Sequence, residues 1–240
     1  MEPDHPRFSR RRFLSIAAVL AATRLLPRRR PLREILSTAP SASEPLSLDI
    51  LCRDAWGAAD RRGSYVRHTV RRITLHHSAV RLEDNRDAPG RFRSHQAYHQ
   101  SLGWPDIAYH ILIDRNGHVY RGRPAWAKGD TGTDYDPRGH LLVLCEGDFE
   151  SQGPSRAQVR SLVRVLAWAC RRFDVPPRRI RGHRDWASTT CPGRNLYALL
   201  ADGRLRRRVR RRLEAGGVTL SRVCGEEGRR RVAAIEAGQA

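Results

Sequence analysis

The order of apolar and polar positions marks several segments of the chain as strands. Residues 71–80 (RRITLHHSAV) have the β-branched and apolar content of a buried strand. Residues 139–147 (GHLLVLCEG) form a continuous apolar run between two glycines, which is typical of a central strand. Residues 106–114 (DIAYHILID) alternate between apolar and polar, and Asn116-Gly117 follows them as a strong hairpin turn signal. We therefore predict a β-sheet that contains a hairpin.

Helical periodicity appears between these strands. Residues 155–173 place five apolar side chains on one helical face, namely Val159, Leu162, Val163, Leu166 and Ala169. Pro176 and Pro177 end this helix. Residues 91–104 also predict a helix, and residues 179–183 predict a short strand. Strands that alternate with helices predict an α/β fold, in which one central mixed β-sheet is flanked by helices.

The C-terminal residues 204–240 differ in composition from the rest. The sequence GRLRRRVRRRLEAG spaces Leu205, Val209 and Leu213 four residues apart on a strongly basic helix. This helix either docks its apolar stripe on the domain or contacts a wall or membrane surface, and the thin stripe favours docking. We therefore predict a folded domain over residues 44–203 and a basic helical C-terminal extension over residues 204–240.

Residues 1–43 have the pattern of an export signal and linker. Arg10, Arg11 and Arg12 precede an uncharged run from Phe13 to Ala22. Such a run is shorter than the roughly 20 apolar residues that span a bilayer, but it suits the apolar region of a signal peptide. An arginine-rich cytoplasmic tail is the alternative. Because the motif resembles the bacterial twin-arginine signal, we expect export to the cell envelope or medium and no transmembrane segment in the mature chain.

The net charge of +20 is carried almost entirely by arginine, since Lys128 is the only lysine. A surface this basic attracts anionic polymers. Nine arginines and four acidic residues give residues 1–45 a charge of +5, which leaves +15 for the remainder. In an exported protein this charge meets anionic wall polymers and membrane head groups first. A specific nucleic-acid binder is poorly supported, because the arginines are spread along the chain and no nucleic-acid motif is present.

Metal-ligand chemistry is concentrated in two places. The polar stretch RGHRDWASTTCPG holds His183 and Cys191 eight residues apart, and His76 and His77 end the first predicted strand. A catalytic zinc site needs three protein ligands and one open position. Successive strand side chains point to opposite faces, so only one of His76 and His77 can face such a site. The spacing alone favours ordinary surface or hydrogen-bonded histidines over metal ligands.

Four ordered segments make the chain similar to a known family. ITLHHSA, GWPDIAYHILIDRNGHVYRGR, HLLVLCEGDF and GHRDWASTTCPG resemble the zinc-dependent N-acetylmuramoyl-L-alanine amidase family, which includes the T7 lysozyme-like amidases and the peptidoglycan recognition proteins. The preceding CRDAWGA matches the entry segment R-x-x-W-G-A of the recognition proteins. The resemblance covers roughly residues 50–200.

The resemblance implies a zinc hydrolase. His76, His183 and Cys191 match the ligands of one Zn²⁺, which activates water and polarises the amide that joins the lactyl group of N-acetylmuramic acid to L-alanine of the peptidoglycan stem peptide. Relatives that only bind peptidoglycan typically lack a ligand at the cysteine position, so Cys191 predicts an enzyme. The alternative function is a non-catalytic module that binds peptidoglycan or muropeptides.

Further site residues follow from the same resemblance. Tyr109 matches the family tyrosine, whose hydroxyl hydrogen-bonds the developing oxyanion or the attacking water. Thr189 occupies a position where T7-like members have a lysine, and its hydroxyl can contribute a hydrogen bond but cannot act as a titrating base near pH 7. Leu144 stands where some amidases place a catalytic glutamate, so Glu146 is expected to be structural. Four residues are expected near the substrate, namely His77, His99, Trp104 and Asp130.

Zinc binding by Cys191 leaves four other cysteines. Cys145 and Cys170 lie in apolar elements and are expected to be buried free thiols. Cys52 and Cys224 bracket the domain in sequence, so a disulfide between them is plausible in an exported protein, but the pairing stays open.

Overall fold

The computed structural model describes residues 45–240, so the expected export signal over residues 1–43 lies outside the described residues. The strands are β1 (Leu46–Leu51), β2 (Arg72–His77), β3 (Ile111–Ile113), β4 (Val119–Arg121), β5 (His140–Cys145), β6 (Ile180–Gly182) and β7 (Val218–Val223). The helices are α1 (Ala88–Ser101), α2 (Arg156–Arg172), α3 (Arg194–Ala201), α4 (Arg204–Glu214) and α5 (Gly225–Glu236), with short 3-10 helices η1 (Asn85–Asp87), η2 (Pro177–Arg179) and η3 (His183–Asp185).

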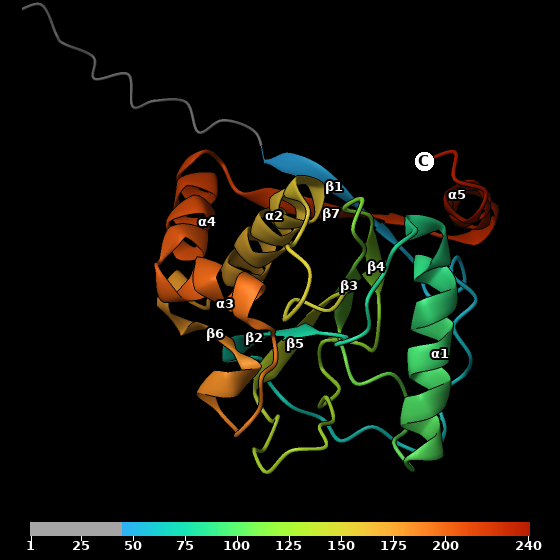
Figure 1. Cartoon of the computed structure of the whole chain (residues 1–240), viewed down its shortest axis with the longest axis horizontal. Coiled ribbons are helices and arrows are strands. Elements are labelled where there is room, and N and C mark those ends of the chain that lie inside the picture. Colours follow the sequence, from blue (N-terminus) through green and yellow to red (C-terminus); the bar gives the residue numbers. More distant parts are fainter. Residues whose placement is uncertain (1–44) are drawn as a thin grey trace, which may run out of the picture. The chain divides into compact units, whose positions relative to one another are not determined.

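The strands form one mixed sheet in the order β6-β2-β5-β3-β4-β1-β7 (Figure 1). Only β3 and β4 pair antiparallel, around the turn at Gly117, whose φ of 90° suits glycine. Strand β5 lies between β2 and β3, and all six of its residues are buried, as its continuous apolar run predicts. The single α/β domain with a central mixed sheet and flanking helices is confirmed.

Each face of the sheet has its own apolar core. On one face, Ile73 and Leu75 of β2 pack with Leu162 and Leu166 of α2. On the other face, Leu112 and Leu144 pack with Phe92 of α1, and α5 adds Val232 and Ile235. Figure 1 shows α1 on one side of the sheet and α2, α3 and α4 on the other. Since side chains alternate along β2, His76 lies on the α1 face.

The strand expected over residues 106–114 is shorter than its alternating pattern suggests. Only Ile111–Ile113 forms β3, and the preceding residues form a loop. The buried carboxylate of Asp106 holds this loop by accepting hydrogen bonds from the amide of Ile107 and the side chain of Gln96, and by pairing with Arg53. These contacts hold the residues before Tyr109, while Tyr109 and His110 still form backbone hydrogen bonds with Leu142, Gly122 and Arg123.

The C-terminal segment is not wholly helical. Helix α4 docks on the domain as expected, with Leu205 and Val209 fully buried. The next residues, however, form strand β7, which pairs in parallel with all six residues of β1. Residues 204–240 are therefore part of the folded domain, because they contribute the edge strand β7 to the sheet, and the predicted helical extension is wrong in this respect. The segment VTLSRV alternates as a strand does. Its partner β1, however, lies 172 residues earlier in the sequence.

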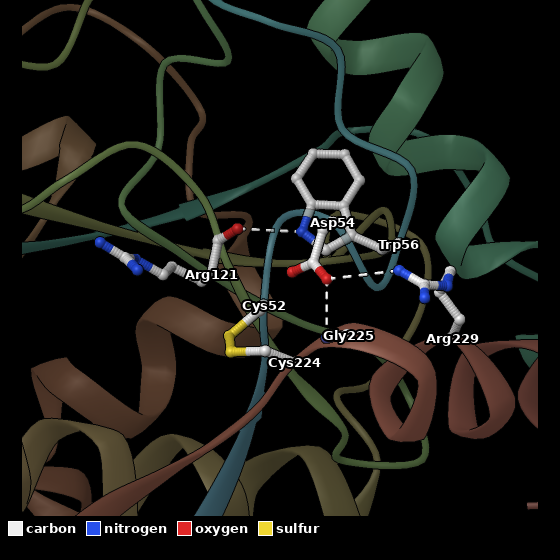
Figure 2. The surroundings of a disulfide bond; sticks show 7 residues. All are labelled: Cys52, Asp54, Trp56, Arg121, Cys224, Gly225 and Arg229. Carbon is white, nitrogen blue, oxygen red and sulfur yellow. Dashed lines mark hydrogen bonds and ion pairs between the residues drawn. A yellow bond between two sulfur atoms is a disulfide. The ribbon is translucent and has the colours of Figure 1, made fainter.

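A disulfide between Cys52 and Cys224 joins the ends of these two strands (Figure 2). Each cysteine directly follows its strand, and the parallel register brings their Cα atoms to 4.9 Å. Asp54 beside the bridge accepts a hydrogen bond from the amide of Gly225. Cys145, Cys170 and Cys191 are free and buried. Among the described residues, no helix is long and apolar enough to cross a bilayer.

We expect Cys224→Ser to lower the free energy of unfolding by about 2–4 kcal/mol, because the disulfide closes a loop of 172 residues and restricts the unfolded chain. Urea unfolding measures the change. Ser47→Ala is the control, since it removes only the 2.7 Å hydrogen bond between Ser47 and Ser221 of the same two strands. An equal unfolding midpoint for Cys224→Ser and Ser47→Ala would contradict this role of the disulfide.

Candidate metal centre and active site

Three potential metal ligands meet at one edge of the sheet. His76 lies near the end of β2, His183 begins η3 directly after β6, and Cys191 lies in the loop before α3. Strands β2 and β6 are parallel neighbours, so their carboxyl ends share this edge. One ligand atom from each of the three residues lies within 4.8 Å of the others, and all three side chains are buried. His76 lies in β2 and His183 directly follows β6, so the pairing of these two strands brings the histidines together.

The geometry and chemistry of this cluster fit zinc. The Sγ atom of Cys191 lies 3.6 Å from Nδ1 of His76. Zinc–ligand distances of about 2.0–2.3 Å in a tetrahedron place a nitrogen and a sulfur ligand about 3.5 Å apart. The other ring nitrogen of His76, Nε2, is buried without a hydrogen-bond partner among the described residues. Imidazole nitrogen and thiolate sulfur are both ligands that zinc takes, and a set of three protein ligands leaves the fourth position open, as in catalytic sites.

Burial sets the protonation of these groups. Burial, followed by the neighbouring His183, lowers the pKa of His76 well below its usual value. Burial also lowers the pKa of His183 to about 4. Both imidazoles are therefore neutral at pH 7, as metal ligation requires. Burial raises the pKa of the Cys191 thiol to about 12, so its thiolate forms only when a cation replaces the proton.

Neighbouring groups hold the ligands in place. Thr133 Oγ1 lies 2.8 Å from Nε2 of His183, and Thr131 Oγ1 lies 2.8 Å from Thr133 Oγ1. The amide of Cys191 donates to Oγ1 of Thr189, and the amide of His77 donates to the Cys191 sulfur. Sequence reasoning missed Thr133 and Thr131, because a threonine in a polar loop carries no signal of its own until the fold places it beside a histidine.

Tyr109 lies beside the cluster on the loop before β3. Its ring centroid is 5.3 Å from that of His76 and 5.7 Å from that of His99. Burial raises the pKa of Tyr109 far above its usual value, with the Cys191 and Glu146 charges adding to the shift. The phenol therefore stays protonated at any physiological pH, and its hydroxyl is available as a hydrogen-bond donor.

A cavity of about 210 Å³ opens over the cluster. All nine residues singled out from the sequence line it, namely His76, His77, His99, Trp104, Tyr109, Asp130, His183, Thr189 and Cys191. The structure therefore brings together side chains from β2, α1, the loop before β3, the loop after β4 and the segment around η3.

Three of the residues expected near the substrate form contacts with other residues of the protein. The ring of His77 stacks on Phe149, and its Nδ1 accepts the amide hydrogen of Phe149. Nδ1 of His99 accepts the amide hydrogen of Ala108. Asp130 forms an ion pair with Arg123. Trp104 packs against His99 with ring centroids 4.9 Å apart and forms part of the cavity wall.

Buried Arg123 is a second feature that the sequence did not reveal. Its guanidinium donates to the carbonyl oxygens of Asp106, Ile107 and Lys128, and it pairs with Asp130. These contacts join the loop that carries Tyr109 to the loop that carries Asp130. Arg123 thus shapes the cavity without lining it.

Glu146 proves to be a structural carboxylate. It is fully buried and accepts hydrogen bonds from His95 Nε2 at 3.0 Å and Ser78 Oγ at 3.1 Å. Leu144 is also fully buried. Asp130 is therefore the only carboxylate that lines the cavity within the described chain, and no free acid stands ready as a general base.

Comparison with known proteins agrees with this site. Residues 66–194 match the family described as N-acetylmuramoyl-L-alanine amidase. Peptidoglycan recognition protein 1 of Mus musculus is 33% identical over 156 residues, which cover 63% of this chain and 85% of that protein. N-acetylmuramoyl-L-alanine amidase of Sus scrofa is 31% identical over 157 residues, which cover 62% of this chain and 26% of that protein.

Solved structures agree with these sequence comparisons. Peptidoglycan recognition protein-LE in complex with tracheal cytotoxin, a monomeric diaminopimelic acid-type peptidoglycan, superimposes with a TM-score of 0.58 at 25% identity, covering 64% of this chain and 92% of that one. The fold and the site define a domain of the amidase and peptidoglycan recognition class. This chain belongs to the N-acetylmuramoyl-L-alanine amidase family.

Proposed function

We propose that this protein is a zinc-dependent amidase that cleaves the bond between the N-acetylmuramoyl lactyl group and L-alanine of peptidoglycan. The observation that carries the proposal is the convergence of His76, His183 and Cys191. A thiol at the third position completes a catalytic ligand set, which a module that only binds peptidoglycan does not need. The amidase relative and the recognition-protein relative have similar identities to this chain, so the site has to decide between the two functions.

Each residue then has a defined task. His76, His183 and Cys191 would hold Zn²⁺, which when bound supplies a polarised substrate carbonyl and a more acidic water. The protonated hydroxyl of Tyr109 donates a hydrogen bond to the oxygen that becomes negative as the amide is attacked. Thr189 fixes the backbone of Cys191 through the amide of that residue. Trp104 and His99 form an apolar wall for the substrate.

An assay on purified sacculi tests this function. We expect the protein to release stem peptides with a free L-alanine amine, and we expect a chelator to stop the release and added Zn²⁺ to restore it. Mass spectrometry of the soluble products identifies the cleaved bond. Binding to sacculi without cleavage, in zinc-loaded protein, would instead establish the alternative function of peptidoglycan or muropeptide recognition.

Location and partners belong to the same proposal. Residues 1–43 would direct export by the twin-arginine route, and the mature protein would act in the bacterial cell envelope or outside it. The positive charge of residues 46–240 would hold the protein near anionic wall polymers. Salt-sensitive retention on purified wall material, compared with retention on walls stripped of anionic polymer, measures this contribution.

We expect Thr133→Val to weaken zinc affinity about 10- to 100-fold, the usual effect of removing an outer-shell hydrogen bond to a ligating histidine. The valine has nearly the same shape but cannot accept a hydrogen from Nε2 of His183. Competition with a fluorescent chelator measures the affinity independently of activity. Thr219→Val on exposed β7 is the matched control, and Thr133→Ser should retain near-normal affinity. Equal affinities for Thr133→Val and Thr219→Val would remove Thr133 from the site.

A further inference from the structure

A second cavity, of about 500 Å³, lies on the opposite face of the sheet from the zinc ligands. It is bounded by the last turn of α2 and by strands β1, β4 and β7, and it shares no lining residue with the first cavity. Tyr120 and Val223 belong to the core on the α1 face, so their neighbours Arg121 and Arg222 point to the α2 face. The α2 face of the sheet therefore carries two arginines at this end.

The walls of this cavity are apolar and its charges are all positive. Trp168, Phe173 and Leu220 form the apolar part, and half-exposed Trp126 stands at the rim. Four arginines line the cavity, namely Arg121, Arg123, Arg172 and Arg222, and no carboxylate lines it within the described chain. A volume of this size is typical of pockets that hold small molecules.

Three arginines of the cavity, Arg121, Arg172 and Arg222, have no acidic partner among residues 45–240, whereas Arg123 pairs with Asp130. Other arginines of this chain find one, as Arg53 does with Asp106 and Arg231 with Asp49. Burial, followed by the nearby charge of Arg222, lowers the pKa of the Arg121 guanidinium. Two like charges held near each other beside an apolar wall are unfavourable unless an anion binds close to them.

The two histidines that line this cavity, His68 and His110, add no charge to it. His68 donates or accepts through both ring nitrogens, with the carbonyl of Ala125 and the amide of Gly139. His110 is bonded in the same way by Ala127 and Leu142, and burial lowers its pKa to about 3. Both imidazole rings are therefore neutral parts of the cavity wall, and the charge of the cavity comes from arginine alone.

We propose that this cavity binds an amphiphile with a phosphate monoester head group. The phosphate would lie between Arg121 and Arg222, whose planar guanidinium groups suit its oxygens, with Arg172 at the rim. The apolar chain would lie along Trp168, Phe173 and Leu220. Leu220 and Arg222 belong to β7, outside the residues 66–194 that match the family, so the site depends on the C-terminal strand of this chain.

Calorimetry with decyl phosphate, below its critical micelle concentration, tests the proposal on the full mature chain. We expect one binding site, and we expect inorganic phosphate and decyl maltoside each to bind at least about 10-fold more weakly, because each lacks one half of the ligand. Equal binding of inorganic phosphate would show that the apolar wall has no part. Equal binding of decyl maltoside would show that the arginines have none. Either result overturns the proposal.

Variants locate the site. Arg222→Gln and Arg121→Gln should each weaken decyl phosphate binding about 10-fold, while Arg210→Gln on the exposed side of α4 should not change it. A decyl phosphate brominated on its chain should also quench tryptophan fluorescence, and Trp168→Phe should reduce that quenching. Unchanged binding in both arginine variants would contradict the proposal. The amidase activity of Arg222→Gln should equal that of the original chain, so this test is independent of the proposed function.

Discussion

Replacing Cys191 by serine is expected to remove zinc and amidase activity together. The thiol would be one of three protein ligands in the proposed site, and a serine hydroxyl is a much weaker ligand for zinc than a thiolate. We expect the zinc affinity to fall at least about 100-fold, beyond the usual effect of losing an outer-shell partner. Metal analysis of the purified protein measures zinc, and product analysis on sacculi measures activity.

The control for this variant is Cys170→Ala. Cys170 is also a buried free thiol, but it lies in α2 within the core of the other sheet face. Its replacement should cost some stability and leave one zinc per chain. If Cys191→Ser kept its zinc and lost only activity, the sulfur would have a role other than ligation. Loss of zinc in both variants would indicate a general effect on folding.

Tyr109→Phe is expected to lower kcat by about 10²–10³ while zinc content stays unchanged. This is the usual effect of removing one hydrogen-bond donor to a developing oxyanion. The phenyl ring keeps the packing of Tyr109 against His76 and His99, so the variant isolates the hydroxyl. Tyr98→Phe is the control, because Tyr98 is 61% exposed on α1 and should not affect activity.

The pH dependence of activity distinguishes donation from base catalysis by Tyr109. Its pKa is raised in the folded protein, so the hydroxyl keeps its proton below and somewhat above the ordinary value of 10. Deprotonation of Tyr109 should therefore cause no loss of activity between pH 6 and 10. A rate that rises with pH toward 10 in the original chain, and not in Tyr109→Phe, would instead point to a tyrosinate base.

The regular elements near the site follow directly from the hydrophobic pattern. The five apolar residues spaced along 155–173 can pack on a sheet only as a helix, and the apolar run of 139–147 can be buried on both faces only as a central strand. The loop around Tyr109 could not be predicted from the pattern, because its alternation of apolar and polar residues suits a strand. The hydrogen bonds of buried Asp106 favour a loop there instead.

The site residues could be named from the sequence because their order and spacing resemble a family. The residues that surround them could not be predicted in this way. Thr133 and Arg123 act through contacts with residues that are distant in sequence, and neither has a local signature. The commitment of the His77 ring to Phe149 likewise depends on a loop that is 72 residues away.

By itself, the sequence determined the α/β class, the central strand and the long helix, because these depend on local periodicity. The resemblance of its motifs to a family added the expected ligand residues. The tertiary structure decided which of His76 and His77 joins the cluster with His183 and Cys191, since packing sets the sheet face of each side chain. It also decided the Cys52–Cys224 pairing and the arginine-lined second cavity. Both depend on β7 joining β1, a contact between the two ends of the domain that no local pattern specifies.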